Sequence, residues 1–452
     1  MNQRSVLSDN AQQERLSIQP INLSSDHVYG KEAEKSSKKI RLENTIAKAL
    51  QLKATLGSVW KYIPGQFPSD FQNYTKGWNS PDKDNQRNSD NAQMFYINLD
   101  LEDSGCTRKC SHCFTMAGQI DIERGRIREN RVQPLTRKIL NKVRLIEQIK
   151  IAQEELGLRS VRLLGRGEPT ESSYLLEFTE KMAELGVVTV LFTRGHVVGN
   201  DIHARRVYRG YGIENGFQLA ERLFAQNVSV IHGYSALNDT VHDGMTGIEG
   251  HSKESTLGLQ RFVETGFLNH HPTRLGIEAP IAKINMIEFP VSYVFFQCIG
   301  ISPIFNSYMV TGRADQSFFD KHTPSFEERL DLHAKIVYFM RQMGIKGQVG
   351  PYLGTKECHD VEHGLYIPSS GDVRPCTGYE SIESIQGDLN VEDIRDVWAH
   401  SRIKGRQHIC PPKLNHGFPL DYVSQLEDML SKRSHLYDQE YQQIISGLGL
   451  QQ

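Results

Sequence analysis

From residue 94 onward, short apolar runs alternate with longer stretches in which apolar residues recur at helical spacing. Short apolar runs bounded by polar residues are typical of strands, and apolar residues at i, i+3 and i+4 are typical of helices. The runs predict six strands, at residues 94–99, 160–164, 187–193, 228–234, 274–281 and 304–310. The helical pattern predicts helices at residues 136–156, 173–185, 217–226, 253–265 and 326–343.

Two helix starts carry the spacing of a capping box, in which a polar cap residue and an acidic residue three positions later bond each other's backbone N–H groups. Ser325 and Glu328 have this spacing before the predicted helix 326–343. Asn285 and Glu288 have it as well, and they predict a further helix that ends near residue 300.

The alternation of strands and helices predicts the fold class. Strands separated by helices at this spacing favour a parallel sheet. Six such units predict an α/β fold, a partial (β/α)6 TIM-type barrel with a C-terminal extension. In barrels of this kind the chemistry lies at the carboxyl ends of the strands.

The composition divides the rest of the chain into segments around the barrel at residues 93–312. Residues 1–35 are polar and aperiodic, which is typical of a disordered tail. The other predicted parts are a helical and loop-rich extension at 36–92, a connecting helix at 313–349, an extension at 350–415 and a C-terminal helix at 416–452.

Charge and hydropathy exclude two classes of partner. The formal net charge of the 452 residues is -2, which gives no basic footprint for nucleic acid. The most apolar stretch, residues 289–305, is too short to span a bilayer and contains two prolines. Residues 1–20 lack the apolar core of a signal peptide, so we expect a cytoplasmic protein without a membrane partner.

The strongest chemical signal is a loop of three cysteines directly after the first predicted strand. Cys106, Cys110 and Cys113 have the spacing C-x3-C-x2-C. Three thiolates on one loop can hold three irons of a [4Fe–4S] cluster and leave the fourth iron open. The amino and carboxylate groups of S-adenosylmethionine (AdoMet) can chelate an open iron. The alternative is a structural zinc site, which needs four tetrahedral ligands and has only His112 to complete it.

The second signal follows the second predicted strand, where residues 165–170 read G-R-G-E-P-T. Glycines let the backbone approach a ligand, and a carboxylate accepts hydrogen bonds from an ammonium group. With the cysteine loop, this segment resembles the radical SAM superfamily. The resemblance implies that AdoMet is bound at Gly165, Gly167, Glu168 and Pro169, with Glu168 on the amino group.

Residues at later strand ends extend this resemblance. Ser235 implies a contact with the AdoMet ribose or carboxylate, and Thr193 and Asn238 imply further contacts. The alternative for these residues is capping of strand-end turns, which hydroxyl and amide side chains favour. The superfamily usually has an arginine a few residues after the serine, and this sequence has Met245 there.

The C-terminal extension contains Cys358, Cys376 and Cys410, with Gly371 completing a C-x12-G-x4-C pattern. This pattern resembles a SPASM or twitch domain, which implies an auxiliary [4Fe–4S] cluster on these cysteines. A fourth ligand could come from His359, His408 or Cys298. Alternatively, Cys298 is a catalytic thiol that returns a hydrogen atom, or a small buried apolar residue.

The resemblance implies a radical SAM oxidoreductase or maturase that cleaves AdoMet reductively to a 5′-deoxyadenosyl radical and takes a hydrogen atom from its substrate. Its partners would be a substrate and an electron donor such as flavodoxin or ferredoxin. Maturation of a peptide or natural product, by oxidation, cross-linking or epimerisation, is one hypothesis. A small polar metabolite such as an aminosugar is another, and a non-catalytic zinc or iron–sulfur module is a third.

A basic segment after the third predicted strand has no assigned task in this scheme. Arg194, Arg205 and Arg206, with His196 and His203, could bind an anionic or polar substrate. Long loops are generally exposed, so the sequence favours a solvated basic loop.

Overall fold

A computed structural model describes residues 31–57, 60–68, 74–78, 93–101, 106–114, 139–310, 312–345, 363–378, 384–401 and 421–450. The chain divides into two compact units, Met1–Ile40 and Arg41–Gln452. Helix α1 (Lys31–Leu56) crosses this division. Residues 31–35, the end of the segment predicted as a disordered tail, form the start of α1, and most of them are residues of good helix propensity.

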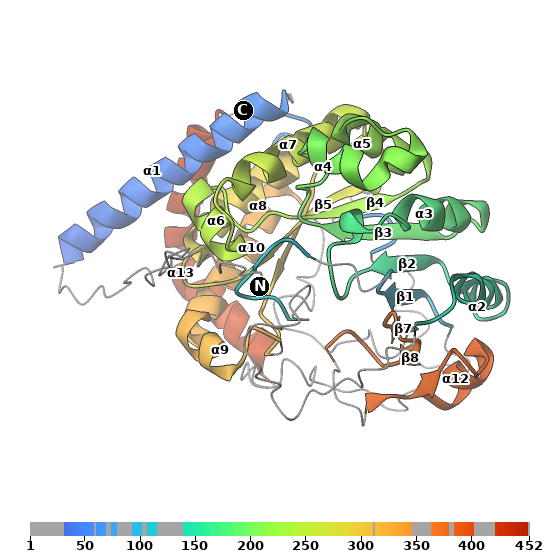
Figure 1. The fold of residues 1–452 in the computed structure, drawn as a ribbon. Coiled ribbons are helices and arrows are strands. Elements are labelled where there is room, and N and C mark those ends of the chain that lie inside the picture. Colours follow the sequence, from blue (N-terminus) through green and yellow to red (C-terminus); the bar gives the residue numbers. More distant parts are fainter. Residues whose placement is uncertain are drawn as a thin grey trace, which may run out of the picture. The chain divides into compact units, whose positions relative to one another are not determined.

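The second unit contains a parallel sheet of seven strands in the order β6-β5-β4-β3-β2-β1-β7 (Figure 1). The strands are β1 (Tyr96–Leu99), β2 (Ser160–Leu163), β3 (Val188–Thr193), β4 (Ser229–Gly233), β5 (Leu275–Pro280), β6 (Ser302–Asn306) and β7 (Gly364–Ile367). The first six confirm the predicted strands, and the parallel α/β sheet confirms the predicted fold class.

The seventh strand is a finding of the structure. β7 pairs in parallel with β1, so part of the predicted extension at 350–415 continues the main sheet. Its four residues lie in the segment that the cysteine pattern assigned to the C-terminal extension, so no strand was predicted there. A two-stranded antiparallel sheet follows it, formed by β8 (Asp372–Val373) and β9 (Gly387–Asp388).

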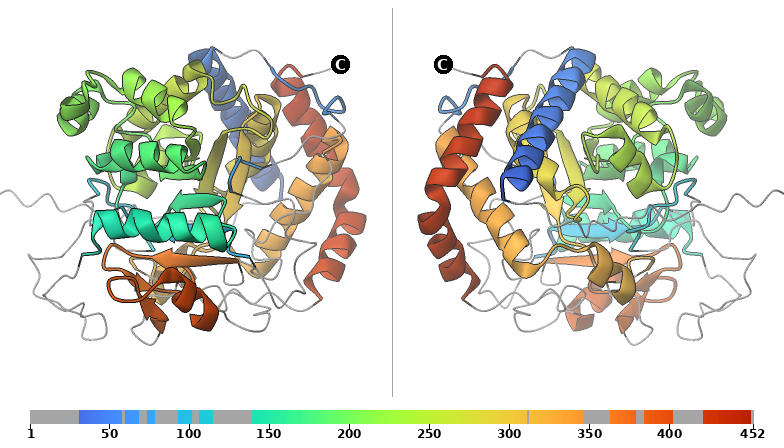
Figure 2. Two further views of the ribbon diagram at one scale, coloured as in Figure 1. Left: turned by 90° about the vertical axis from the view of Figure 1, so that its right-hand side faces the viewer. Right: turned by 90° about the vertical axis from the view of Figure 1, so that its left-hand side faces the viewer.

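Helices connect and surround these strands (Figures 1 and 2). Their bounds are α2 (Lys142–Glu155), α3 (Leu175–Glu184), α4 (Asp201–Tyr208), α5 (Gly216–Ala225), α6 (Asp239–Thr246), α7 (His251–Thr265), α8 (Phe289–Cys298), α9 (Gln316–His322), α10 (Phe326–Met343), α12 (Ile394–Ser401) and α13 (Tyr422–Gly447). Short 3₁₀ turns are η2 (Pro169–Glu171), η3 (Arg209–Tyr211) and η4 (Met286–Glu288). The sequence pattern missed α4, α6, α9 and α12, which have seven or eight residues each and too few turns to show a period.

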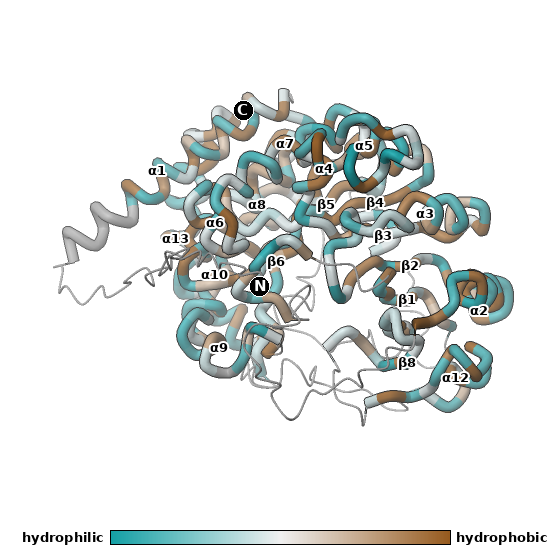
Figure 3. Tube along the Cα trace, viewed as in Figure 1, coloured by the Kyte–Doolittle hydropathy of each residue, from teal (hydrophilic) through white to brown (hydrophobic). Residues whose placement is uncertain are grey.

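The core fills the space between the sheet and its helices. Among the described residues, the largest cluster of buried apolar side chains includes residues from every strand of the seven-stranded sheet and from α2, α3, α5, α7, α8 and α10. Along α2 and α5, hydrophobic and hydrophilic positions alternate as expected for helices with one face on a core (Figure 3). The predicted capping box of α10 is confirmed, because Ser325 Oγ accepts from Glu328 N while Glu328 Oε2 accepts from Ser325 N. No helix within the described ranges is both long and apolar enough for a membrane span.

Helices α10 and α13 pack side by side, as both views of Figure 2 show. Between them His333 is buried, and its Nδ1 lies 2.5 Å from the hydroxyl of Tyr422. Burial lowers the pKa of His333 to about 3. The unfolded chain takes up a proton on this histidine below about pH 6.5, whereas the folded chain does not until about pH 3. Stability therefore falls as the pH drops below 6.5.

We expect a His333→Gln variant to be less sensitive to acid than the wild type. One buried neutral histidine costs roughly 1.4 kcal/mol of stability per pH unit below its unfolded pKa, about 2 kcal/mol by pH 5. The loss of unfolding free energy between pH 7 and pH 5, measured by urea denaturation, should be smaller in the variant by about this amount. His435→Gln, at an exposed histidine of α13, is the control. Equal losses in wild type and His333→Gln would contradict the assignment.

Candidate functional site

The cysteine loop lies beside the C-terminal end of α6 and the segment that follows β6. Lys109 N donates to Thr246 O (3.0 Å) and Ser111 N to Met245 O (3.3 Å). On the other side, Arg313 N donates to Cys113 O (2.8 Å). Backbone bonds from two elements thus fix the loop that carries the three thiols.

A glycine allows this close approach. A Cβ atom on Gly312 would lie 2.4 Å from Cys113 O, and Gly312 has a φ of +64°. Both the space and the backbone conformation therefore require glycine. Gly312 lies about 200 positions after the loop in the sequence, so a distant part of the chain packs against the loop.

Burial and neighbouring charges shift the pKa values of two thiols of the loop. Burial raises the pKa of Cys106, and the charge of Glu168 raises it further. Burial also raises the pKa of Cys110, which Arg194 and Arg313 oppose. Buried thiols of this kind ionise when a metal binds them, because thiolates are the ligand form. The residues present therefore fit an iron–sulfur cluster on Cys106, Cys110 and Cys113.

The zinc alternative needs His112 as its fourth ligand. His112, the fourth ligand of the zinc alternative, instead has its Nε2 2.8 Å from Arg194 Nη2.

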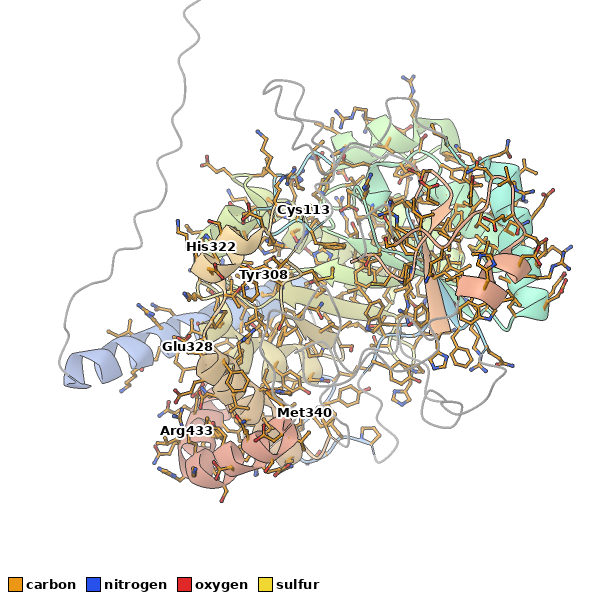
Figure 4. All side chains as sticks on the ribbon, turned by 90° about the horizontal axis from the view of Figure 1, so that it is seen from below. Cys113, Tyr308, His322, Glu328, Met340 and Arg433 are labelled. Atoms are coloured by element: carbon orange, nitrogen blue, oxygen red, sulfur yellow. The ribbon has the colours of Figure 1, made fainter. Side chains whose placement is uncertain are left out.

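Aromatic rings form one wall beside the loop. The ring centroids of His112 and Tyr308 are 5.8 Å apart, and Tyr308 contacts Phe318 at 5.4 Å. Phe318 stacks on His322 of α9 at 4.4 Å. Cys113, Tyr308 and His322 are labelled in Figure 4, well away from Met340 of α10 and Arg433 of α13. This wall covers the loop on the side of the segment after β6.

The turn after β2 is held by a residue that the sequence pattern did not single out. Asp100, directly after β1, accepts from Arg166 N (2.7 Å) and from the Tyr366 hydroxyl of β7 (2.8 Å). A Cβ atom on Gly165 would lie 1.6 Å from Asp100 Oδ1. Gly165 therefore has to be glycine, because any side chain there would collide with Asp100. Gly167 has a φ of +89°, a left-handed conformation that lets the chain turn. The sequence signal that could have identified Asp100 is an acidic residue directly after an apolar strand.

Glu168 is buried and its carboxylate is already positioned by its neighbours. Oε1 accepts from the hydroxyls of Thr170 (2.7 Å) and Thr193 (2.6 Å), and Oε2 accepts from Arg194 N (2.8 Å). Pro169 opens the 3₁₀ turn that follows. The predicted residues Glu168 and Thr193 are thus brought together, with Thr193 orienting the carboxylate.

Arg194 corrects the prediction of a solvated basic loop. Its Nη1 donates to Ser235 Oγ (3.1 Å), and its Nη2 faces His112. Burial, and next the charge of Arg194, hold the pKa of His112 well below its usual range, so this ring is a neutral acceptor. Arg205 and Arg206 lie exposed on α4, where the solvated description is correct. The arginine at this site, Arg194, directly follows β3. The superfamily arginine would instead lie a few residues after Ser235, where this chain has Met245.

The remaining predicted residues divide into two groups. Ser235 is buried and contacts Arg194. Asn238 is exposed, and its Oδ1 caps α6 by accepting from Val241 N (3.2 Å). The structure therefore brings Ser235 to the site and places Asn238 in the turn-capping position that the sequence left open.

The capping box predicted for Asn285 and Glu288 is wrong. The residues form a 3₁₀ turn before α8, and Asn285 makes no side-chain cap. Asn285 Nδ2 donates instead to Ser235 O (2.8 Å), and Glu288 Oε2 accepts from Leu237 N (2.6 Å). Both side chains are used to hold the turn after β4.

Cys298, the candidate catalytic thiol, lies in the core at the end of α8. It is fully buried in the apolar core, and burial raises the pKa of its thiol to about 12. It ends α8, just before β6 begins, so it lies toward the amino ends of the strands. The cysteine loop follows β1 at the carboxyl ends. Cys298 is a core residue, as the apolar alternative predicted.

Of the auxiliary-cluster cysteines, the structure describes Cys376. It is buried after β8, and its Sγ accepts from Gly378 N (3.4 Å). Cys358, Cys410 and the candidate fourth ligands His359 and His408 lie outside the described residues.

The chain is similar in fold to several solved structures. No family model and no curated protein matches the chain. Among solved structures, anSMEcpe with bound AdoMet matches with a TM-score of 0.50 at 14% identity, over 79% of this chain and 98% of that chain. SuiB of Streptococcus suis, bound to precursor peptide SuiA, matches at 0.49 and 14%, over 72% and 67%. BtrN in complex with AdoMet and 2-DOIA matches at 0.31 and 11%, over 76% and 91%.

The chain has the fold of radical SAM enzymes. This assignment uses the anSMEcpe match, because the other two TM-scores lie below 0.5. The predicted resemblance is confirmed at the level of the fold. The chain spans about two thirds of the length of SuiB.

Proposed function

We propose that the chain is a radical SAM enzyme with a [4Fe–4S] cluster on Cys106, Cys110 and Cys113. The observation that carries the proposal is a pair of opposite charges beside the cysteine loop. The carboxylate of Glu168 and the guanidinium of Arg194 belong to adjoining strand ends, joined by the bond from Arg194 N to Glu168 Oε2. This pair matches the amino and carboxylate groups of an amino acid such as the methionine part of AdoMet.

In this proposal each residue has a defined task. A [4Fe–4S] cluster with bound AdoMet supplies one-electron cleavage of the sulfonium bond. Glu168 accepts hydrogen bonds from the ammonium group, and Arg194 donates to the carboxylate, as charged partners do most strongly. Ser235 and Thr193 hold Arg194 and Glu168 in place. The rings of His112 and Tyr308 restrict water on one side of the loop.

The substrate and further cofactor remain proposals from the sequence. We propose maturation of a peptide or natural product as the overall reaction, with a small polar metabolite as the second candidate. An auxiliary [4Fe–4S] cluster on Cys358, Cys376 and Cys410, and an electron donor such as flavodoxin or ferredoxin, complete the proposal. Return of a hydrogen atom from Cys298 is no longer part of it, because that thiol lies in the core.

The experiment is anaerobic reconstitution followed by reduction in the presence of AdoMet. We expect wild type to hold about eight irons and to release 5′-deoxyadenosine and methionine. A Cys106/Cys110/Cys113→Ala variant should hold about four irons and release neither product, because the cluster that binds AdoMet is lost.

Cys298→Ala is the matched control, since it removes one buried thiol away from the loop. It should retain the irons and the product release of wild type. The proposal fails if wild type releases no 5′-deoxyadenosine, or if the triple variant keeps all its iron.

A further inference from the structure

A second group of metal-ligand side chains lies next to the cysteine loop and has no task in the proposed function. Glu171 ends η2, His196 follows β3, and His203 lies on α4. One ligand atom from each residue lies within 4.8 Å of the other two. We propose that Glu171, His196 and His203 bind a divalent transition-metal ion.

The donor set is suited to such an ion. Two imidazoles and one carboxylate form a ligand set for iron and, with a fourth ligand, for zinc. His196 is fully buried, with Nε2 2.7 Å from Glu171 Oε1. Its Nδ1 has no hydrogen-bond partner within the described part of the chain. With the ion on Nε2, the proton of the neutral ring would be on Nδ1.

Small movements would suffice to admit the ion. Ligands at about 2.0–2.2 Å from a tetrahedral ion lie roughly 3.3–3.6 Å apart. The contact between His196 and Glu171 is 2.7 Å, so these two groups would separate by less than 1 Å. His203 is partly buried on the first turn of α4, and the backbone there is fixed by Asn200, which accepts from His203 N (3.0 Å).

The group is also connected to the cysteine loop. Thr107, next to Cys106, donates to Glu171 through both its hydroxyl (2.5 Å) and its N–H (3.2 Å). The hydroxyl lies 3.4 Å from His196 Nε2, so it is a candidate further ligand for the ion. An ion held here would fix Glu171, and through Thr107 the start of the loop.

A plain hydrogen-bonded chain from Thr107 through Glu171 to His196 is the competing explanation. It requires no ion and no part for His203. Removal of His203 therefore separates the two explanations, because it is needed for metal binding alone.

The test measures zinc binding in the Cys106/Cys110/Cys113→Ala variant, so that the three cysteines of the loop cannot contribute. After incubation with Zn²⁺ and gel filtration, we expect about one zinc per chain above the background set by His196→Gln/His203→Gln in the same variant. Co²⁺ in place of Zn²⁺ should give the visible absorption of a nitrogen and oxygen site. Adding His203→Gln alone should abolish both, whereas His270→Gln, at an exposed histidine, should change neither.

Zinc content equal to the background, or unchanged by His203→Gln, would overturn the proposal in favour of the hydrogen-bonded chain. If the triple variant does not fold, the same comparison is made with wild type after iron reconstitution, counting zinc beside iron. Neither measurement depends on AdoMet, so absence of 5′-deoxyadenosine release leaves this result unaffected.

Discussion

An Arg194→Gln variant is expected to bind AdoMet about 100-fold more weakly than wild type once both carry the same number of irons. Hydrogen bonds to charged groups contribute about 1.5–3 kcal/mol each. Loss of the guanidinium removes the cation proposed to bind the AdoMet carboxylate and also frees Ser235 and His112. Glutamine keeps an N–H donor on a shorter side chain and lacks the charge.

The surroundings of Arg194 make this effect specific. A Cβ atom on Gly233 would lie 2.8 Å from Arg194 Nη1, so β4 leaves room for the guanidinium. The positive charge of Arg194 also opposes the raised pKa of the Cys110 thiol. We therefore expect slower cluster incorporation as a second effect, measured as iron bound against time.

The measurement is anaerobic equilibrium dialysis of AdoMet, expressed per cluster. Arg206→Gln is the control, because it removes an exposed arginine of α4. Arg194→Lys should lie between wild type and Arg194→Gln, since lysine keeps the charge and loses the two-pronged geometry. Affinity of Arg194→Gln within about threefold of wild type would remove Arg194 from the proposed site, because less than 1 kcal/mol would then be lost.

The second large effect is expected for Gly165→Ala, which should unfold or displace the turn that carries Glu168. The added Cβ would lie 1.6 Å from Asp100 Oδ1, far inside contact distance. Asp100 cannot turn away without losing its bonds to Arg166 N and the Tyr366 hydroxyl. Overpacking and two unmade buried bonds together should cost about 4 kcal/mol.

Thermal unfolding and AdoMet binding would both report this change. Gly210→Ala is the control, since a Cβ there meets nothing within 4 Å and the backbone is not left-handed. On an Asp100→Ala background the same Gly165→Ala change should cost much less, because the carboxylate is gone. An equal cost on both backgrounds would mean that the collision with Asp100 is not the cause.

Sequence patterns predicted the fold because the features that define it are local. The first six strands of the sheet and the capping of α10 by Ser325 follow from residues within a few positions of one another. β7 was not predicted, because its four residues become a strand only by pairing with β1, more than 260 positions earlier.

The cysteine spacing and the G-R-G-E-P-T segment are likewise contiguous, so the sequence by itself determined which loops are candidates for chemistry. Tertiary structure alone decided how they are completed. In the sequence, Arg194 is one of several basic residues in a predicted loop. In the structure, the neighbouring strands β3 and β4 bring its guanidinium to Ser235. Asn285 and Glu288 have the spacing of a helix cap, yet stronger partners lie in the turn after β4, so the cap does not form.

The assignment of cysteines shows the same division. Spacing alone identified Cys106, Cys110 and Cys113 as one group, because ligands on a short loop are close in any fold. Nothing local distinguishes a catalytic thiol from a buried one, and Cys298 is settled by its position at the end of α8. Short-range spacing can be read along the chain, whereas contacts between distant segments exist only once the sheet has brought the strand ends together.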